Sequence, residues 1–480
     1  MNRNFIGGEW VGGAGGDVVR RNENPSDVSD IVGVYAQADA AQARMALRAA
    51  REAQPAWAAG GIQARAAALD AVGSELLARQ RELGTLLSRE EGKTLAEGIA
   101  EVARAGHIFK YFAGEALRVR GDRLESVRPG VEVDVVREPL GVVGIITPWN
   151  FPMAIPAWKI APALAYGNSV VFKPADLVPG SAWALAEIIS RSGMPAGVFN
   201  LVMGRGSVVG EVLATSDEVN GISFTGSVST GKRLLSQATQ QLTRLQLEMG
   251  GKNPLVILED ANLDIAVECA VQGAYFSTGQ RCTASSRFIV EKGIYSEFAA
   301  RLVAAMKTLR VGHALHPDTQ IGPVADAAQL QTDLEYVETG KAEGATLACG
   351  GELLRRETEG FFLSPALFTD ASAQMRIARE EIFGPVACAI VADDFDHAMS
   401  LANDSPYGLS AGICTSSLQK ASYFRRHMKS GMVMVNVPTA GVDYHVPFGG
   451  TKGSSYGSRE QGAHAIEFYT TIKTAYTRAA

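Results

Sequence analysis

The chain has 480 residues, more than one ordinary hydrophobic core accommodates, so we expect two or three domains. A composition of 46% hydrophobic and 20% charged residues is typical of a globular protein. The formal net charge of −6 argues against a general nucleic-acid-binding protein, in which a basic excess is usual. The sequence shows neither an apolar run of membrane-spanning length nor the apolar core of a signal peptide at the N-terminus. We therefore expect a cytoplasmic protein that contacts neither nucleic acid nor membrane.

Five cysteines are scattered along the chain, and no two have the spacing of a zinc site or of a disulfide framework. We therefore expect no bound metal and a reducing compartment. The cysteines are Cys269, Cys282, Cys349, Cys388 and Cys414.

The N-terminal quarter of the chain is predicted to be helical after a short β region. Residues 1–35 read as short strands and turns, among them 5–10 and 18–19. Residues 39–116 are rich in Ala, Leu, Glu and Arg at helical spacing, which predicts several amphipathic helices. The segment Glu-Gly-Lys-Thr at 91–94 interrupts these helices with a turn.

Two segments far apart in the sequence are candidates to pair as strands. Residues 131–136 alternate apolar and polar side chains, as a half-exposed strand does, and residues 467–473 have a similar character. Such an outlying pair is either an arm that adds to a neighbouring subunit or an ordinary edge hairpin, and both interpretations stay open.

From residue 140 the pattern changes to buried strand, turn and helix. Continuous apolar strands that alternate with helices indicate a parallel sheet covered on both faces, the α/β class. Ligands bind beyond the carboxyl ends of such strands, where Asn150, Lys173 and Ser227 are expected. The strands are predicted at 141–146, 168–172, 198–202 and 219–224.

A second α/β set follows residue 254. It contains the loop around Cys282, and its strands are predicted at 255–258, 287–290 and 387–391. We expect this set to form a second domain that faces the first across a cleft.

Cys282 lies among small, flexible and hydroxylated residues, in Phe-Ser-Thr-Gly-Gln-Arg-Cys-Thr-Ala-Ser-Ser-Arg at 276–287. Gly279 lets the backbone approach a ligand closely, and the guanidinium of Arg281 favours the thiolate, which is the nucleophilic form. Cys282 is therefore a candidate nucleophile. The alternative is a small apolar side chain in a core.

Two further polar residues have surroundings that suit catalysis. Glu248 precedes Met-Gly-Gly, and a partly desolvated carboxylate can act as a base near neutral pH. The alternative is a surface or helix-terminal Glu. The side-chain amide of Asn150 can donate to a developing oxyanion, or it can cap a turn.

Two other classes of function are open alternatives. Residues 226–232 have P-loop spacing and 255–260 could form a Walker B strand, but Arg233 stands where a Ser or Thr would bind Mg²⁺. The spaced glycines also suit a dinucleotide pyrophosphate at a helix N-terminus. A Cys–His enzyme is disfavoured, because none of the seven histidines has comparably glycine-rich surroundings.

Seven motifs, in this order along the chain, together resemble the aldehyde dehydrogenase superfamily. The resemblance covers essentially the whole chain, and seven ordered motifs are far more specific than any one of them. The motifs are TPWNFP at 147–152, FKPA at 172–175, FTGS at 224–227, LEMGGKNP at 247–254, GQRCT at 279–283, EEIFGP at 380–385 and PFGG at 447–450.

The resemblance implies a reaction and the residues that perform it. In that family a cysteine attacks the aldehyde, hydride passes to NAD(P)⁺, and the resulting thioester is hydrolysed. By matching, Cys282 is the nucleophile and Glu248 the base that activates water. Asn150 and the backbone N–H of Cys282 form the oxyanion hole, and Lys159 and Glu460 resemble a proton relay behind Glu248.

The implied cofactor is NAD or NADP, with NAD favoured. Lys173 and Glu381 match positions that hold the two riboses, Phe383 matches one near the nicotinamide ribose, and Trp149 is expected on the adenine side. Asp176 stands where NAD-preferring members often carry Glu, so some use of NADP is expected. The residues expected to bind the cofactor are Ile146, Thr147, Pro148, Trp149, Lys173, Ala175, Asp176, Gly206, Phe224, Gly226, Ser227, Gly250, Glu381 and Phe383.

The expected substrate is an aldehyde with a distal keto acid. Trp158 and Phe276 resemble the aromatic tunnel of general aldehyde oxidisers, whereas Arg281 matches an arginine that engages the distal carboxylate in antiquitin. The run 138–287 is similar to bacterial α-ketoglutaric semialdehyde (2,5-dioxopentanoate) dehydrogenases. A broad-range enzyme, or one for succinic or glutaric semialdehyde, is the alternative. The expected substrate contacts are Phe151, Trp158, Phe276, Arg281, Thr283 and Phe448.

The resemblance implies an aldehyde dehydrogenase-like α/β fold with three parts, and a homodimer or homotetramer. A Rossmann-type NAD(P)-binding domain is expected at 1–118 and 139–249, and an α/β catalytic domain at 250–463. A small β oligomerisation arm is expected at 119–138 and 464–480.

Overall fold

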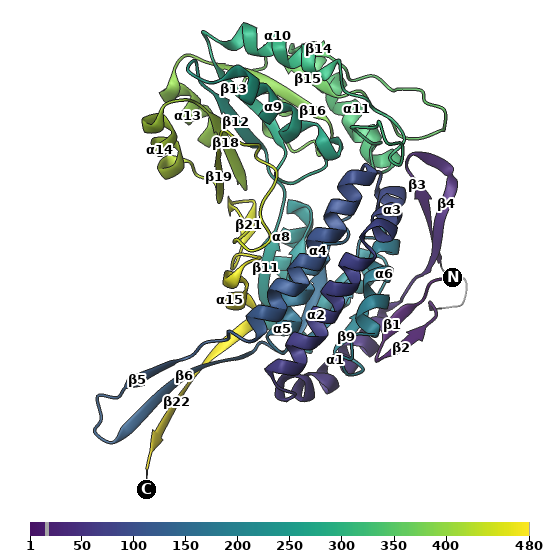
Figure 1. The fold of residues 1–480 in the computed structure, drawn as a ribbon, viewed down its shortest axis with the longest axis vertical. Coiled ribbons are helices and arrows are strands. Elements are labelled where there is room, and N and C mark those ends of the chain that lie inside the picture. Colours follow the sequence, from purple (N-terminus) through teal and green to yellow (C-terminus); the bar gives the residue numbers. More distant parts are fainter. Residues whose placement is uncertain (15–18, 480) are drawn as a thin grey trace.

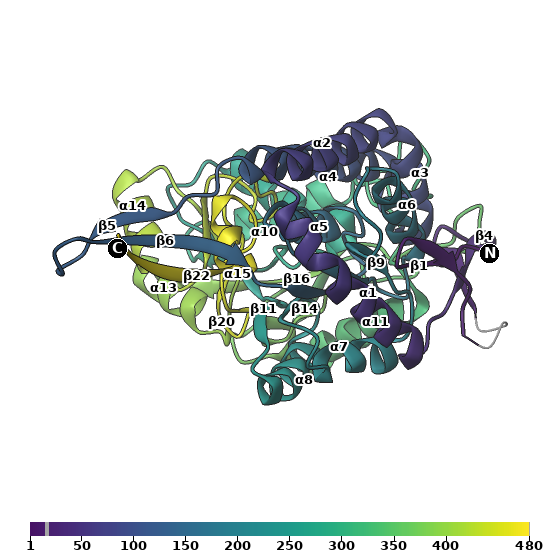
Figure 2. The same cartoon turned by 90° about the horizontal axis from the view of Figure 1, so that it is seen from below.

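The computed structural model describes residues 1–14 and 19–479. It contains two large sheets flanked by helices and a narrow third sheet that projects from the body of the molecule (Figure 1, Figure 2). Val18, in a predicted N-terminal strand, and Ala480, at the end of the predicted arm, lie outside the described residues. None of the helices in the described part is both long and apolar enough to cross a membrane.

The first sheet has eight strands, and its centre is a parallel core in the order β9-β8-β7-β10-β11. The strand order reverses between β7 and β10, as in Rossmann-type sheets, where ligands bind beyond the carboxyl ends at the reversal. Antiparallel strands β1, β2 and β21 extend the edges. The strands are β1 (Asn4–Ile6), β2 (Glu9–Val11), β7 (Val142–Ile146), β8 (Ser169–Lys173), β9 (Phe199–Leu201), β10 (Gly221–Thr225), β11 (Arg244–Glu248) and β21 (Ser455–Tyr456).

Helices cover both faces of this sheet because successive side chains of a strand point to opposite sides. Val143 and Ile145 pack in a core with α2 to α6, whereas Val142 and Ile146 pack in a core with α1, α7 and α8. The predicted doubly covered parallel sheet is therefore confirmed. The helices are α1 (Ala40–Ala59), α2 (Ile62–Ala78), α3 (Gln80–Glu91), α4 (Leu95–Ala116), α5 (Ala154–Ala165), α6 (Pro179–Ser190), α7 (Glu211–Thr215) and α8 (Val228–Ala238).

The predicted turn at 91–94 is confirmed, and it sets where α4 begins. Helix α3 ends at Gly92, whose φ of 94° is a left-handed conformation that favours glycine. Thr94 then caps α4 in a capping box with Glu97, in which each side chain accepts a hydrogen bond from the other residue's backbone N–H.

The second sheet has seven strands in the order β14-β15-β16-β13-β12-β18-β19, all parallel except β14. A small ladder joins β17 to β20. The strands are β12 (Asn253–Ile257), β13 (Ser285–Glu291), β14 (Thr346–Cys349), β15 (Ala366–Thr369), β16 (Val386–Ala392), β17 (Tyr407–Gly408), β18 (Ser410–Cys414), β19 (Met432–Val435) and β20 (Thr451–Lys452). The helices are α9 (Leu263–Ala274), α10 (Tyr295–Met306), α11 (Ala327–Ala342), α12 (Arg376–Arg379), α13 (Phe395–Asn403) and α14 (Leu418–His427).

The chain crosses between the two bodies more than once. The hairpin of β3 (Val19–Asn24) and β4 (Asp27–Ala36) contacts the second body, where Ala314 N donates to Ser26 Oγ at 2.9 Å. Strand β21 pairs with β11, so the chain returns to the first sheet before residue 463, where the second domain was predicted to end.

The projecting sheet consists of β5 (Asp122–Glu125), β6 (Val131–Pro139) and β22 (Thr470–Arg478) (Figure 1). Its register runs from Thr470 opposite Pro139 to Arg478 opposite Val131. The predicted pairing of the two segments is therefore confirmed. The predicted C-terminal strand begins too early, because Ile466–Tyr469 form the short helix α15.

Candidate active site

Cys282 lies in a loop whose backbone conformation is held from outside. Residues 277–279 all have positive φ, from 52° to 67°, a conformation that costs a non-glycine residue on the order of 1 kcal/mol or more. At Gly279 a side chain cannot be accommodated, because a Cβ would lie 2.3 Å from the carbonyl oxygen of Gly384. The loop therefore needs surrounding contacts to keep this shape.

Two cavities meet at Cys282, which is the one described residue that lines both. The larger, of about 330 Å³, is lined by residues of α4 and α5, of the loop after α9 and of 441–448. The smaller, of about 230 Å³, lies beyond the carboxyl ends of β7, β10 and β11, at the reversal of strand order. A nucleophile in this position can meet one reactant from each side.

The larger cavity is mainly aromatic near the nucleophile. Trp158 and Phe448 stack there with ring centroids 5.4 Å apart. The structure brings together every residue predicted to contact the substrate: Phe151, Trp158, Phe276, Arg281, Thr283 and Phe448 all line this cavity. It also brings in charged residues that the sequence reasoning missed, namely Lys93, Glu97, Glu101 and Arg104.

Half of the residues predicted to bind the cofactor line the smaller cavity. Those inside are Pro148, Trp149, Gly226, Ser227, Gly250, Glu381 and Phe383. Those outside its lining are Ile146, Thr147, Lys173, Ala175, Asp176, Gly206 and Phe224. Gln329 was missed; its side chain lines the cavity and donates to the carbonyl of Ile382 at 2.9 Å.

Close backbone packing shapes the smaller cavity. A Cβ on Gly250 would lie 1.8 Å from a carboxylate oxygen of Glu381, which accepts a hydrogen bond from Gly251 N at 2.9 Å. Trp149 and Phe383 meet edge to face with centroids 5.4 Å apart. The two residues predicted on the adenine side and near the nicotinamide ribose thus lie in contact in one cavity.

Lys173 lies just outside this cavity at the end of β8. Its Nζ donates to the carbonyl of Pro174 at 2.8 Å and pairs with Asp176 at 3.4 Å. Burial lowers the pKa of Lys173, and the carboxylate of Asp176 opposes that shift. Lys173 and Asp176, both expected to bind the cofactor, are thus neighbours.

The surroundings of the Cys282 thiol favour its protonated form. Burial, together with the carboxylates of Glu381 and Glu248, raises the pKa of this thiol to about 12, although the backbone N–H groups of Cys282 and Thr283 act in the opposite direction. The predicted stabilisation of the thiolate by Arg281 is outweighed. The guanidinium donates instead to the carbonyls of Gln272 and Gly273 at the end of α9.

Glu248 is buried at the carboxyl end of β11, so the interpretation as a surface or helix-terminal residue is wrong. One carboxylate oxygen accepts a hydrogen bond of 2.6 Å from Ser455 Oγ, on the neighbouring strand β21. Burial raises the pKa of Glu248 well above its usual value, and the nearby carboxylate of Glu460 adds to this. A carboxylate with a raised pKa is a stronger base. Glu248 lines neither cavity.

Lys159 and Glu460 form a buried ion pair, as the predicted relay requires. Lys159 Nζ also donates to Ser223 Oγ at 2.9 Å, and Trp158 Nε1 donates to the other oxygen of Glu460 at 2.7 Å. The indole of Trp158 therefore joins the aromatic cavity to this polar group. The connection to Glu248 is electrostatic, since Glu460 raises its pKa and Lys159 lowers it.

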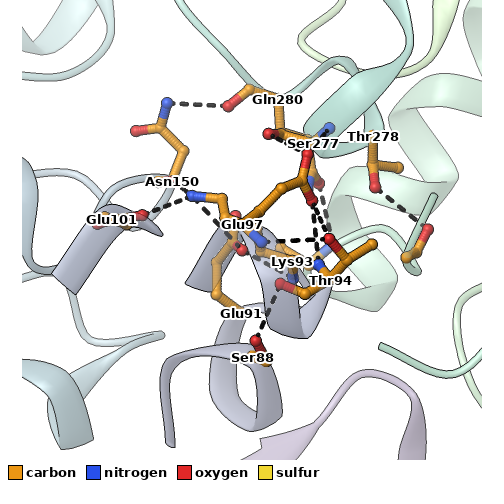
Figure 3. A network of polar contacts seen from close by, with 12 residues as sticks. Ser88, Glu91, Lys93, Thr94, Glu97, Glu101, Asn150, Ser277, Thr278 and Gln280 are labelled. Atoms are coloured by element: carbon orange, nitrogen blue, oxygen red, sulfur yellow. Dashed lines mark hydrogen bonds and ion pairs between the residues drawn. The ribbon is translucent and has the colours of Figure 1, made fainter. Parts of the chain in front are cut away.

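A polar network at the start of α4 holds both loops of the site (Figure 3). Lys93 Nζ donates to the carbonyl of Asn150 and to Glu101, each at 2.7 Å, and Glu101 also caps the start of α5. Glu97 accepts hydrogen bonds from the backbone N–H and hydroxyl of Ser277, at 2.9 and 3.0 Å.

Asn150 links the two loops directly. Its side-chain Nδ2 donates to the carbonyl of Gln280 at 2.9 Å, two residues before the nucleophile, and the residue lines the smaller cavity beside Cys282. A primary amide has two N–H groups, so one remains for another acceptor. Asn150 therefore has the position and the donor that an oxyanion site needs.

The two alternative functions find no support in the site. Lys232, which a P-loop would direct at phosphates, is exposed and lines neither cavity, while Ser227 caps α8. No described histidine lines the cavities beside Cys282, which leaves a Cys–His pair without a partner there.

Comparison with known proteins agrees with this geometry. The model of the Aldehyde dehydrogenase family matches residues 10–475. The chain is 44% identical over 477 residues to the alpha-ketoglutaric semialdehyde dehydrogenase of Bacillus subtilis (strain 168), covering 99% of this chain and 98% of that protein. It is 39% identical over 471 residues to the 2,5-dioxopentanoate dehydrogenase of Saccharolobus solfataricus, covering 98% of each.

A solved structure shows the same fold. The crystal structure of betaine aldehyde dehydrogenase from Staphylococcus aureus in complex with NAD⁺ superposes with a TM-score of 0.97 at 35% identity, covering 100% of this chain and 95% of that one. Nearly the whole chain is thus matched in sequence and in fold. The chain belongs to the aldehyde dehydrogenase family.

Proposed function

We propose that this protein oxidises α-ketoglutaric semialdehyde to α-ketoglutarate, with NAD⁺ as the hydride acceptor. The observation that carries the proposal is the position of Cys282 between a cavity lined by aromatic and cationic side chains and a cavity at the strand ends. The relatives named for this semialdehyde, at 44% and 39% identity over nearly the full length, support the substrate.

In the proposed reaction, Cys282 loses its proton and its sulfur attacks the aldehyde carbon. The amide of Asn150 and the backbone N–H of Cys282 donate to the oxygen that becomes negative. Loss of the hydride of the aldehyde carbon to a bound NAD⁺ would leave the acyl group on Cys282 as a thioester. Glu248 then takes a proton from the water that attacks this thioester, which releases the carboxylic acid and the thiolate of Cys282. Glu248 can pass that proton on to the group formed by Lys159 and Glu460.

The smaller cavity suits a nicotinamide dinucleotide. It lies at the reversal of strand order, where Gly226 and Gly250 keep the backbone free of side chains, and Trp149, Glu381 and Phe383 would hold the bound group. When bound there, NAD⁺ would supply the acceptor for the hydride that the aldehyde carbon of the substrate loses. We propose NAD⁺ rather than NADP⁺ because the carboxylate of Asp176 beside Lys173 would repel a 2′-phosphate.

The larger cavity favours an anionic substrate over a cationic one. The crystal structure at 35% identity is of a betaine aldehyde dehydrogenase, whose named substrate is a cation. Here three cationic side chains (Lys93, Arg104, Arg281) and two acidic ones (Glu97, Glu101) line the cavity. We propose that Arg281 contacts the distal carboxylate of the substrate.

We also propose the predicted division of the chain, with a nucleotide-binding domain, a catalytic domain and an arm that joins subunits into a homodimer or homotetramer. The arm exposes Ile472 and Tyr476, at 62% and 61% of their surface, and exposed apolar side chains on an edge strand favour association. Location in the cytoplasm stays a prediction.

The test compares kcat/KM for α-ketoglutaric semialdehyde, succinic semialdehyde and hexanal, each with NAD⁺ and NADP⁺. We expect the keto-acid semialdehyde with NAD⁺ to lead by tenfold or more, about 1.4 kcal/mol. Arg281→Met should remove most of that lead. Equal rates with hexanal would show instead that the aromatic walls set the specificity, and the substrate proposal would be wrong.

A further inference from the structure

We infer that Arg104, on α4, is a specificity-determining residue that binds the distal carboxylate of the substrate together with Arg281. This inference rests on the proposed function in one respect, that the substrate carries a carboxylate. It adds Arg104, on α4, to Arg281, which the family resemblance indicated and which lies in the loop of Cys282.

The first observation is that both guanidinium groups lack an acidic partner. Among the described residues, no carboxylate lies within 4.0 Å of a nitrogen of Arg104 or Arg281. The Nε atoms of both residues are buried and have no hydrogen-bond partner in the described part of the chain. Buried charges are normally paired, and a buried N–H without an acceptor costs free energy.

The second observation is that the acidic residues of the same cavity are already engaged. Glu101 is paired with Lys93 at 2.7 Å, and Glu97 accepts hydrogen bonds from Ser277 and Thr94. Their charges, and that of the exposed Asp443, reach the arginines only at longer range. The cavity therefore has a cationic excess that a carboxylate would offset.

The third observation concerns the geometry of Arg104. Its Nη2 donates to Gln461 Oε1 at 3.2 Å, and its guanidinium carbon lies 5.8 Å from the ring of Trp158. These contacts hold the guanidinium of Arg104 beside the indole of Trp158. In the described part of the chain, neither its Nε nor its Nη1 has a hydrogen-bond acceptor. A planar guanidinium binds a carboxylate through two parallel N–H groups, so it suits this role better than lysine.

The experiment measures kcat/KM for α-ketoglutaric semialdehyde and for hexanal in wild type, Arg104→Met and a matched control. Arg118→Met serves as the control, because Arg118 lies just beyond the end of α4 with its side chain 61% exposed. We expect Arg104→Met to lower kcat/KM for the semialdehyde tenfold or more, chiefly through KM, and to change the hexanal value less than twofold. Arg118→Met should change neither value.

Two further measurements separate binding from structural support. Calorimetric titration with glutarate, a dicarboxylate that cannot react, should show at least tenfold weaker binding in Arg104→Met. Arg104→Gln, which keeps a donor for Gln461 but has no charge, should behave like Arg104→Met. In the double variant with Arg281→Met, the loss should be smaller than the product of the single losses, because both side chains bind one carboxylate.

The possible results distinguish this inference from the proposed substrate. If Arg104→Met and Arg104→Gln lower kcat/KM equally for both aldehydes, or leave glutarate binding unchanged, Arg104 has only a structural role and the inference is overturned. If wild type prefers succinic or glutaric semialdehyde and Arg104→Met removes that preference, the inference stands and the proposed substrate is wrong.

Discussion

Lys93 Nζ lies 2.7 Å from the backbone carbonyl oxygen of Asn150, so a buried ammonium supports the residue proposed to bind the oxyanion. Burial lowers the pKa of Lys93, but the carboxylates of Glu101 and Glu91 outweigh this effect and raise it. The charged form is therefore maintained inside the protein. The side chain also lies 3.8 Å from the ring centroid of Phe151, a cation–π contact on the next residue of the same loop.

Replacing this ammonium should damage both stability and catalysis. Lys93→Met leaves Glu101 buried without its partner, which typically costs about 3–5 kcal/mol of unfolding free energy. We expect kcat to fall at least tenfold because the Asn150 loop loses its support. Urea unfolding and steady-state kinetics measure the two effects. Lys110→Met is a suitable control, because Lys110 lies on α4 and its ion pair with Asp70 is exposed.

Glu97 has the matching role for the nucleophile loop. In Glu97→Gln one oxygen becomes an NH₂ group, which cannot accept hydrogen bonds, so the contacts to Ser277 or Thr94 are lost. We expect kcat to fall while the affinity for NADH stays within about twofold, because α4 does not line the smaller cavity. NADH fluorescence titration tests the second part. An unchanged kcat would show that the loop keeps its shape without Glu97.

Removal of the thiol tests the centre of the mechanism. Cys282→Ala should abolish NADH formation from any aldehyde, since no acyl intermediate can form. Cofactor binding should persist, because Cys282 is only one of the residues around the smaller cavity. NADH fluorescence measures cofactor binding, and absorbance at saturating aldehyde measures NADH formation. Measurable turnover in this variant would exclude Cys282 as the nucleophile.

The raised pKa of Cys282, about 12, predicts how alkylation depends on pH. Below that pKa the thiolate fraction grows tenfold per pH unit, so the iodoacetamide rate of the cofactor-free protein should rise from pH 7 to 10 without a plateau. Burial raises the pKa of Glu381 to about 7, so above pH 7 its negative charge holds the thiol protonated.

Glu381→Gln removes that charge, lowers the pKa of Cys282 and should accelerate alkylation at pH 9. One pKa unit corresponds to a tenfold change in rate. Glu380→Gln is the control, because Glu380 is half-exposed and paired with Arg376. A plateau near pH 8 in wild type, or no acceleration in Glu381→Gln, would contradict the assigned environment of the thiol.

Disruption of the arm tests its proposed function in assembly. Ile472→Asp places a charge among the exposed apolar residues of β22 and should shift the sedimentation profile toward monomer at fixed protein concentration. Thr477→Asp, on the opposite face of the same strand, is the control. A monomeric wild type would exclude the arm as an oligomerisation element.

The strand ends were the part of the site that the sequence predicted well. Continuous apolar runs with a regular spacing predicted β7, β8 and β10, and Asn150, Lys173 and Ser227 lie at or just after their carboxyl ends as expected. These predictions depend on local pattern alone. They succeeded because a parallel sheet places all of its carboxyl ends on one edge.

The supporting residues could not be predicted in the same way. Lys93, Glu97 and Glu101 are spaced by four residues, which reads as the exposed face of an amphipathic helix. Lys93 and Glu101 are buried and Glu97 is half-buried, through contacts with residues 52 to 180 positions away in the sequence. The partner of Glu248, Ser455, is 207 residues away. The predicted effect of Arg281 on the thiol is outweighed by burial and by the carboxylates of Glu381 and Glu248, whose positions depend on the folded chain.

The single residue shared by the two cavities has a consequence for how such a protein can diverge. The walls of the larger cavity come from α4, α5 and the segment 441–448, whereas those of the smaller come mainly from strand ends of the first sheet. Apart from Cys282 no described residue belongs to both linings, although contacts such as that of Lys93 with Asn150 connect them. A new aldehyde preference can therefore be acquired, or engineered, through substitutions in the larger cavity while the residues that line the smaller cavity stay the same, provided that Cys282 is retained.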